Sequence, residues 1–307
     1  MSKKIIAILL ALTFVFAFAA CGGKTEDTTT TTAETTADPF AEVDDTTAAP
    51  AAEDSTAAPA AEDTTAAGAE DTTAASQAAD ATTAAASEST TAAAAMPQTK
   101  EEIVAYFNNA VNGVKKNAKS ITHHYSKISL NGTAKLPGWA DNLLKLFGGA
   151  DAFINDQLSS NSKGEQVYTG SDIKKFPVEN ESWASKLTAA DVKEAKIVEK
   201  DGQYIVRIVT VADGKSSTVK HGQGHAPKAF NVILPGTVND ALGNIPGAKK
   251  LVGGDAEMEY PPSTATIYVD IATGRVMKAE YDLKWTINFG TEIVIPFTTV
   301  DSYTIKY

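Results

Sequence analysis

The stretch from Met277 to Phe289 alternates between apolar and polar side chains without a break. Successive side chains of a strand point to opposite faces of a sheet, so the pattern predicts one long β-strand with an apolar and a polar face. At about 3.3 Å per residue it would span roughly 40 Å, and strands of that length usually belong to sheets that coil. The predicted apolar face carries Met277, Ala279, Tyr281, Leu283, Trp285, Ile287 and Phe289.

Two further alternating segments flank this strand, one from Thr264 to Val269 and one from Ile293 to Tyr307. Turn residues separate the three, with Ala272-Thr273-Gly274 before the long strand and Gly290 after it. Strands joined by such short turns pair antiparallel. In the last segment the apolar residues at odd-numbered positions, which would share one face of the strand, are Ile293, Ile295, Phe297, Tyr303, Ile305 and Tyr307.

An amphipathic helix is predicted from Lys100 to Ala118. Thr99 and Glu102 form a capping box at its start, and apolar residues follow at helical spacing. Its apolar stripe is expected to cover the long strand. A strand from Ile121 to Leu130, with Tyr125 as its apolar anchor, and two short helices within Trp139 to Leu158, separated at Gly148-Gly149, come next.

The middle of the chain is less regular. A short strand is predicted at Gln166–Gly170, a cap or turn at Thr188 and Asp191, and a hairpin around Asp201-Gly202. We expect a loop over 212–226, a helical turn around Asp240 and irregular chain over 247–262. Together the elements predict an α+β fold, with a strongly curved antiparallel sheet, a half-barrel, covered on its concave face by helices.

The N-terminus predicts export. Lys3 and Lys4 precede an apolar run from Ile5 to Ala20 that is short for a transmembrane span. A basic segment, an apolar segment and small residues before a cleavage point are typical of a signal peptide, which we assign to residues 1–20. An ordinary signal peptide that happens to contain a cysteine is the alternative to the lipoprotein signal described next.

Cys21 is the one cysteine of the chain, so no intramolecular disulfide can form. Phe18-Ala19-Ala20-Cys21 resembles the lipobox of bacterial lipoproteins of the Gram-positive type, although Phe18 stands where that group usually has leucine. The resemblance implies that Cys21 is acylated with a lipid bearing chains such as palmitate. The mature protein would then be lipid-anchored on the extracytoplasmic face of the cell membrane.

Residues 21–96 consist almost entirely of Thr, Ala, Ser, Asp and Glu, and between Gly22 and Ala95 the only large apolar residues are Phe40 and Val43. Such a segment buries too little apolar surface to offset its ordering entropy, so we predict a disordered tether. Between Lys24 and Met96 fifteen acidic residues stand against one lysine. Residues 97–307, predicted to form one domain, carry 24 basic and 23 acidic residues, which does not indicate a nucleic-acid partner.

The element order over 97–307 and the turn from Tyr268 to Arg275 resemble the LolA/LppX-like group of bacterial lipid and lipoprotein carriers. The resemblance implies a half-barrel that holds acyl chains on its concave face. It assigns no functional residue. The turn itself is structural, with Gly274 expected in the left-handed conformation.

The remaining chemistry is sparse. His221 and His225 lie four residues apart in a glycine-rich segment and could bind a metal ion, but a zinc site needs three or four ligands, so a solvated loop is the preferred interpretation. His123 and His124 are adjacent on a strand and point to opposite faces. Asp255, Glu257 and Glu259 could bind calcium weakly or keep an edge strand soluble. No nucleophile elbow, phosphate loop or zinc-protease motif is present, so we expect no enzyme, no cofactor and no resident metal.

Two functions remain open. In the first, an apolar or lipid-like ligand binds the sheet face that carries Tyr281, Leu283, Trp285, Ile287 and Phe289. Trp139, Trp183 and Trp285 could contribute to such a site, although aromatic residues at strand parity usually belong to a core. In the second, helices pack that face completely, and the domain is a structural or protein-interaction module of the cell envelope.

Overall fold

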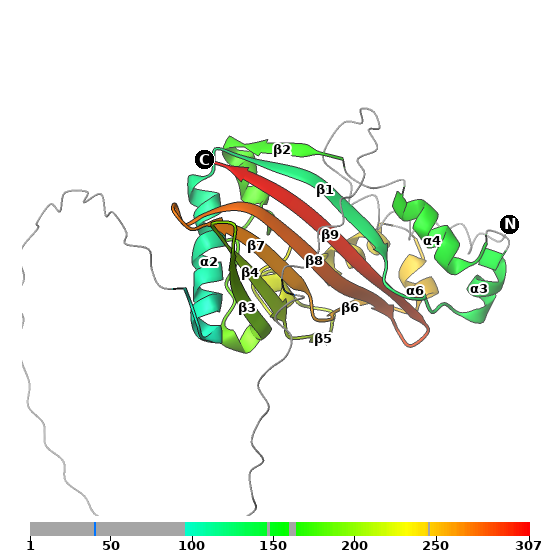
Figure 1. Cartoon of the computed structure of the whole chain (residues 1–307). Coiled ribbons are helices and arrows are strands. Elements are labelled where there is room, and N and C mark those ends of the chain that lie inside the picture. The colour runs from blue at the N-terminus through cyan, green and yellow to red at the C-terminus, as the bar shows by residue number, and fades with distance from the viewer. Residues whose placement is uncertain (1–39, 41–95, 146–147, 160–163, 245) are drawn as a thin grey trace, which may run out of the picture. The chain divides into compact units, whose positions relative to one another are not determined.

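A computed structural model describes residues 40, 96–145, 148–159, 164–244 and 246–307. These residues form a mixed α and β fold around one open, nine-stranded antiparallel sheet (Figure 1). The strand order is β2-β1-β9-β8-β7-β4-β3, and β6 pairs with both β5 and β8. The predicted α+β class with a large antiparallel sheet is therefore confirmed. The predicted signal peptide, Cys21 and nearly all of the tether lie outside the described residues.

The strands are numbered β1 to β9 in the order in which they occur along the chain. Neighbours in the sheet are antiparallel throughout. Their bounds are β1 Ser120–Leu130, β2 Gln166–Thr169, β3 Val192–Lys200, β4 Gln203–Thr210, β5 Asp213–Ser216, β6 Ala256–Tyr260, β7 Thr264–Asp270, β8 Arg275–Phe289 and β9 Ile293–Lys306.

Strand β8 lies in the middle of the strand order and pairs on both sides. It pairs with β9 from Lys278 to Phe289 on one side. On the other side its first part pairs with β7 and its last part, Thr286 to Phe289, pairs with β6. We call the sheet face that carries Tyr281, Leu283 and Trp285 the core face, because these side chains are buried in the main hydrophobic cluster.

The alternation fails at both ends of β8. Met277 is exposed and Val276 is buried. The register with β7 shifts between Tyr268 and Val269, so that beyond the shift the even-numbered residue of β8, not the odd-numbered one, points to the core face. At the other end Thr286 and Asn288, which the pattern assigns to a polar face, are buried as well. A similar register shift between β1 and β9, after His123, leaves the expected apolar anchor Tyr125 exposed.

Helix α2 (Lys100–Asn117) confirms the predicted amphipathic helix. The Thr99 side chain accepts from the Glu102 N–H, and the Glu102 carboxylate accepts from the Thr99 N–H, so the capping box is complete. Its buried side chains are Ile103, Val104, Phe107, Val111 and Val114. The helix contacts β3, β4 and β8. In Figure 1 it runs across the end of the sheet that carries β3 and β4.

The remaining helices are short. Helices α3 (Gly138–Leu144) and α4 (Ala150–Ser159) confirm the predicted pair, and α4 contacts β1. Helix α5 (Pro235–Gly243) forms where the helical turn was predicted. The 3-10 helices η2 (Gly170–Lys175), η3 (Ala189–Asp191) and η4 (Ala226–Lys228) lie in connections.

Two predictions about the connections are wrong. The loop predicted over 212–226 contains β5, and the stretch predicted as irregular over 247–262 contains α6 (Ala248–Val252) and β6. Strand β6 is not an edge strand, since it pairs on both sides. Its Glu257 and Glu259 alternate with buried Ala256, Met258 and Tyr260. Among the described residues no helix is long and apolar enough to cross a membrane.

Candidate functional site

A cavity of about 410 Å³ lies on the core face of β1, β8 and β9. Strand β2, the end of η2 and the connection after it, the loop around His221, the segment 231–234 and helix α5 supply its remaining walls. It is lined by His123, Ser126, Ile128, Gln166, Tyr168, Lys175, Glu179, Asn180, Glu181, His221, Asn231, Val232, Ile233, Leu234, Thr237, Val238, Ala241, Leu283, Trp285, Thr299, Asp301 and Tyr303.

The strand register divides the floor of this cavity into a polar and an apolar end. Across β1 and β9, His123 lies opposite Tyr303 and Ser126 opposite Asp301. Further along the same strands, Ile128 lies opposite Thr299, which in turn lies opposite Leu283 of β8. Trp285 comes next, so polarity falls along the strands towards the end of β8 that pairs with β6.

The polar end is built around the imidazole of His123. Its Nε2 lies 2.9 Å from Asp301 Oδ1 and its Nδ1 lies 2.9 Å from the Tyr168 hydroxyl. A carboxylate only accepts, so Nε2 carries the proton, and in a neutral ring Nδ1 accepts the Tyr168 hydroxyl proton. The Tyr303 ring stacks on His123 with centroids 4.4 Å apart. His123 is thus fixed on three sides.

Burial, reinforced by the nearby Asp301 carboxylate, raises the pKa of Tyr168 to about 12. The same two causes, burial first, raise the pKa values of Tyr281 and Tyr303 well above the ordinary value. These phenols therefore remain protonated at neutral pH.

At the apolar end of the cavity, Trp285 packs against a second aromatic ring. The Trp285 ring stacks on Phe297 with centroids 4.3 Å apart, and its Nε1 donates to the Thr299 hydroxyl at 2.9 Å. Val238 and Ala241 of α5 face this cavity too. Helix α5 contacts β6, which pairs with the end of β8, so the helix wall lies towards the apolar end.

Helix α2 holds the segment 174–187, which forms one wall. Lys115 Nζ donates to the backbone carbonyls of Lys174, Val178 and Glu181 at 2.7–2.9 Å. Burial lowers the pKa of Lys115 to about 8, against the opposing effect of the Glu181 carboxylate. Asn112 adds bonds to the backbone of Ala184 and Ser185. The polar face of a core helix thereby positions Glu179 and Glu181 at the cavity.

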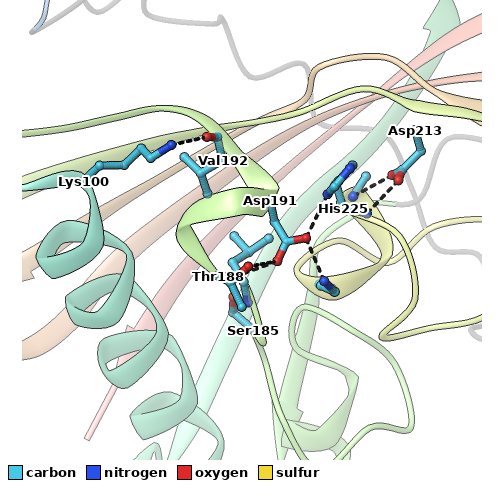
Figure 2. Close-up of polar contacts among 10 residues, drawn as sticks. Lys100, Ser185, Thr188, Asp191, Val192, Asp213 and His225 are labelled. Atoms are coloured by element: carbon cyan, nitrogen blue, oxygen red, sulfur yellow. Dashed lines mark hydrogen bonds and ion pairs between the residues drawn. The ribbon is translucent and has the colours of Figure 1, made fainter. Parts of the chain in front are cut away.

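Two carboxylates, the buried Asp191 and the half-buried Asp213, hold the loop that carries His221. Asp213 accepts from the backbone N–H groups of His225 (2.7 Å) and Ala226 (2.8 Å). Gly224 sits against this contact with φ +74°, and a Cβ there would lie 2.6 Å from Asp213 Oδ1, which explains the glycine. Figure 2 shows Asp213 and Asp191 approaching His225 from two sides.

Asp191 is the most heavily bonded side chain in this region (Figure 2). It accepts from the N–H and hydroxyl of Thr188, from His225 Nδ1 (2.8 Å) and from Lys228 Nζ (2.7 Å). Burial alone would raise its pKa, but the hydrogen bonds from Lys228, Thr188 and His225 outweigh burial and lower the pKa to about 2. The predicted cap at Thr188 and Asp191 is confirmed and is part of this network.

The sequence-predicted ligand face is distributed between the cavity and the core. Leu283 and Trp285 line the cavity. Tyr281, Ile287 and Phe289 are buried in the hydrophobic cluster and do not line it. Tyr281 is enclosed by edge-to-face contacts with Phe176 and Phe230, and its hydroxyl has no partner among the described residues.

The candidate metal residues do not come together. His225 is bound to Asp191, whereas His221 lines the cavity and burial lowers its pKa. His123 and His124 bond to different partners, Asp301 and Glu165, as expected for opposite faces. In the described part of the chain no three His, Cys, Asp or Glu side chains are grouped so as to hold a metal ion.

Sequence reasoning missed the polar end of the cavity. The signal was present in β9, where the odd-numbered positions are otherwise mostly apolar but Thr299 and Asp301 are polar. A charged residue in the inward row of a strand needs a partner, and here the partner is His123, 178 residues away in the chain.

Comparison with known proteins gives no relative: no protein-family model, no curated protein and no solved structure matches this chain. The resemblance to LolA/LppX-like carriers stays a prediction, and the function has to be argued from the cavity.

Proposed function

We propose that this chain is a membrane-anchored extracytoplasmic lipoprotein whose folded domain binds an apolar or lipid-like ligand in the cavity. The observation that carries the proposal is the 410 Å³ cavity beside Leu283 and Trp285, on a sheet face that is otherwise buried. Small-molecule sites occupy roughly 300–1,000 Å³ and combine apolar walls with a few fixed polar groups. The cavity floor is polar at the Asp301 end and apolar at the Leu283 end, which fits an amphipathic ligand with its chain beside Leu283 and its polar group near Asp301.

The proposal includes a half-barrel in which the sheet curves around the ligand and helices close its concave face. Its support is the length of β8 and β9, 15 and 14 residues, and the contacts of α2, α4 and α5 with different strands of the sheet. Long strands in a sheet accumulate twist, which favours coiling.

The anchor and location rest on the sequence pattern around Cys21 and on the acidic tether. An acyl group on Cys21 and a self-repelling spacer of about seventy residues would keep the domain at the membrane yet away from its surface. A membrane and a lipid-like ligand are therefore the proposed partners. An envelope protein is the alternative partner in this location.

The proposal assigns no chemical reaction to the cavity. The Asp301 carboxylate and the Tyr168 hydroxyl hold the two ring nitrogens of His123. The polar groups are placed to orient a ligand.

A bulky side chain at Ser126 tests the proposal. Ser126→Phe places a ring in the cavity and should reduce ligand binding at least about tenfold, because occupied volume excludes the ligand. Ser129→Phe is the matched control, since Ser129 lies on the same strand but does not line the cavity. Binding is measured by titrating the full chain with dodecyl maltoside below its micelle concentration and following tryptophan emission. Equal affinities for the two variants would contradict the proposal.

A further inference from the structure

The polar end of the cavity carries an excess of negative charge. Asp301, Glu179 and Glu181 line it, and Lys175 is the one lysine or arginine among the described residues of its lining. The Lys175 ammonium lies 3.1 Å from Asp172, a residue outside the lining, so part of its charge is already compensated. An anionic group in this end would face three carboxylates, whereas a cation would face one ammonium, that of Lys175, whose charge Asp172 partly offsets.

The carboxylates are also short of partners. Within the described part of the chain, His123 is the one hydrogen-bond partner of the Asp301 carboxylate, whose side chain remains 17% exposed. A carboxylate offers about four acceptor positions, so most of its capacity is open. The structure shows no hydrogen bond to the Glu179 or Glu181 carboxylates from any described residue, although Glu181 interacts electrostatically with Lys115 and both carboxylates do so with His221. The backbones of the two residues are held by Asn231 and Lys115.

Aromatic rings line the same end. The rings of Tyr168 and Tyr303 belong to the lining, and Lys175 Nζ already lies over the Tyr168 ring, 5.6 Å from its centroid. Ring faces attract cations, and a carboxylate next to aromatic rings is the combination that recognises ammonium and quaternary ammonium groups. Asp301 lies directly opposite Tyr281 and Ser126 in the register, in the row next to Tyr303.

We infer that the cavity selects a ligand whose polar group is cationic, an ammonium or quaternary ammonium group on an apolar chain. This inference rests on the proposed function, because it assumes that the cavity is occupied by an amphipathic molecule. The ammonium group lies between Asp301, Glu179 and the tyrosine rings, and the chain follows the floor towards Leu283 and Trp285.

The test uses three probes that share a dodecyl chain: dodecyltrimethylammonium, dodecyl maltoside and dodecyl sulfate, each titrated into the full chain below its micelle concentration. Tryptophan emission is the readout, since the chain's three tryptophans all lie outside the acidic tether. The cationic probe is expected to bind at least about tenfold more tightly than the sulfate probe, with the maltoside between them.

Matched variants separate the cavity from general charge effects. Asp301→Asn keeps an acceptor for His123 and should reduce the affinity for the cationic probe about tenfold while changing that for maltoside less than about twofold. Glu179→Gln, in an exposed connection, should act in the same direction if Asp301→Asn folds poorly. Glu199→Gln removes the same charge from an exposed position of β3 outside the cavity and should change nothing.

Two failures are distinguishable. If the maltoside or sulfate probe binds as tightly as the cationic one, or if Asp301→Asn and Glu179→Gln leave the preference intact, the head-group inference is overturned and the proposed function stands. If none of the three probes binds, the proposed function fails, and this inference with it.

Discussion

Trp285→Ala is expected to destabilise the domain by about 4 kcal/mol, the largest effect of any single substitution considered for this protein. The side chain is buried at 1% exposure, stacks on Phe297 and donates to Thr299, so truncation removes apolar contacts, enlarges the cavity and leaves a hydroxyl without its donor. Urea unfolding followed by far-ultraviolet circular dichroism measures the change.

Met277→Ala is the control on the same strand. The sequence pattern alone assigns Met277 and Trp285 to one face, but Met277 is exposed, and its truncation should change the free energy of unfolding by less than about 0.5 kcal/mol. Similar costs for the two variants would show that β8 does not have the register described.

Asp191→Asn is expected to cost about 3 kcal/mol. The carboxylate is buried at 4% side-chain exposure, and its loss leaves the Lys228 ammonium, itself 24% exposed, without its counter-charge. The neutral amide of the variant also accepts more weakly than a carboxylate from Thr188, His225 and Lys228. Equilibrium unfolding at neutral pH is the measurement.

The pH dependence separates this charge effect from simple loss of packing. The pKa of Asp191 falls from 3.8 to about 2 on folding, so its stabilising contribution is complete above 3.8 and is lost as the pH falls through about 2. The difference between wild type and Asp191→Asn should therefore shrink as the pH is lowered. A difference that is constant down to the acid transition would contradict the account.

Asp255→Asn is the matched control. It removes one partner of an exposed ion pair with Lys249 and should lower the free energy of unfolding by less than about 1 kcal/mol.

Long periodic elements were predictable from the sequence because their signal is repeated many times. Helix α2 and strand β8 start and end within about two residues of the predicted bounds, a margin typical of element ends. The parity of β8 failed at Met277 because one register shift against β7 changes the face of every residue beyond it. Nothing in the local sequence of β8 records that shift.

The cavity was less predictable, because it depends on which segments meet. Leu283 and Trp285 belonged to the predicted ligand face, yet Tyr281, on the same row, is covered by Phe176 and Phe230 from distant connections. The polar end needs β1 to pair with β9, which brings His123 to Asp301. The short elements β5 and α6 escaped prediction, and β6 was considered only as an edge strand, since a few residues carry too little periodicity to distinguish them from loops.

Native mass spectrometry of the full chain, purified without detergent, tests the central claim most directly. The account predicts a discrete additional mass that is lost when the protein is denatured in organic solvent, and it predicts that Ser126→Phe lacks this mass while Ser129→Phe retains it. An acyl group on Cys21 is covalent and would survive denaturation, so it cannot be mistaken for a bound ligand. A native mass equal to the denatured mass would contradict ligand binding and would indicate that the cavity is not a ligand site.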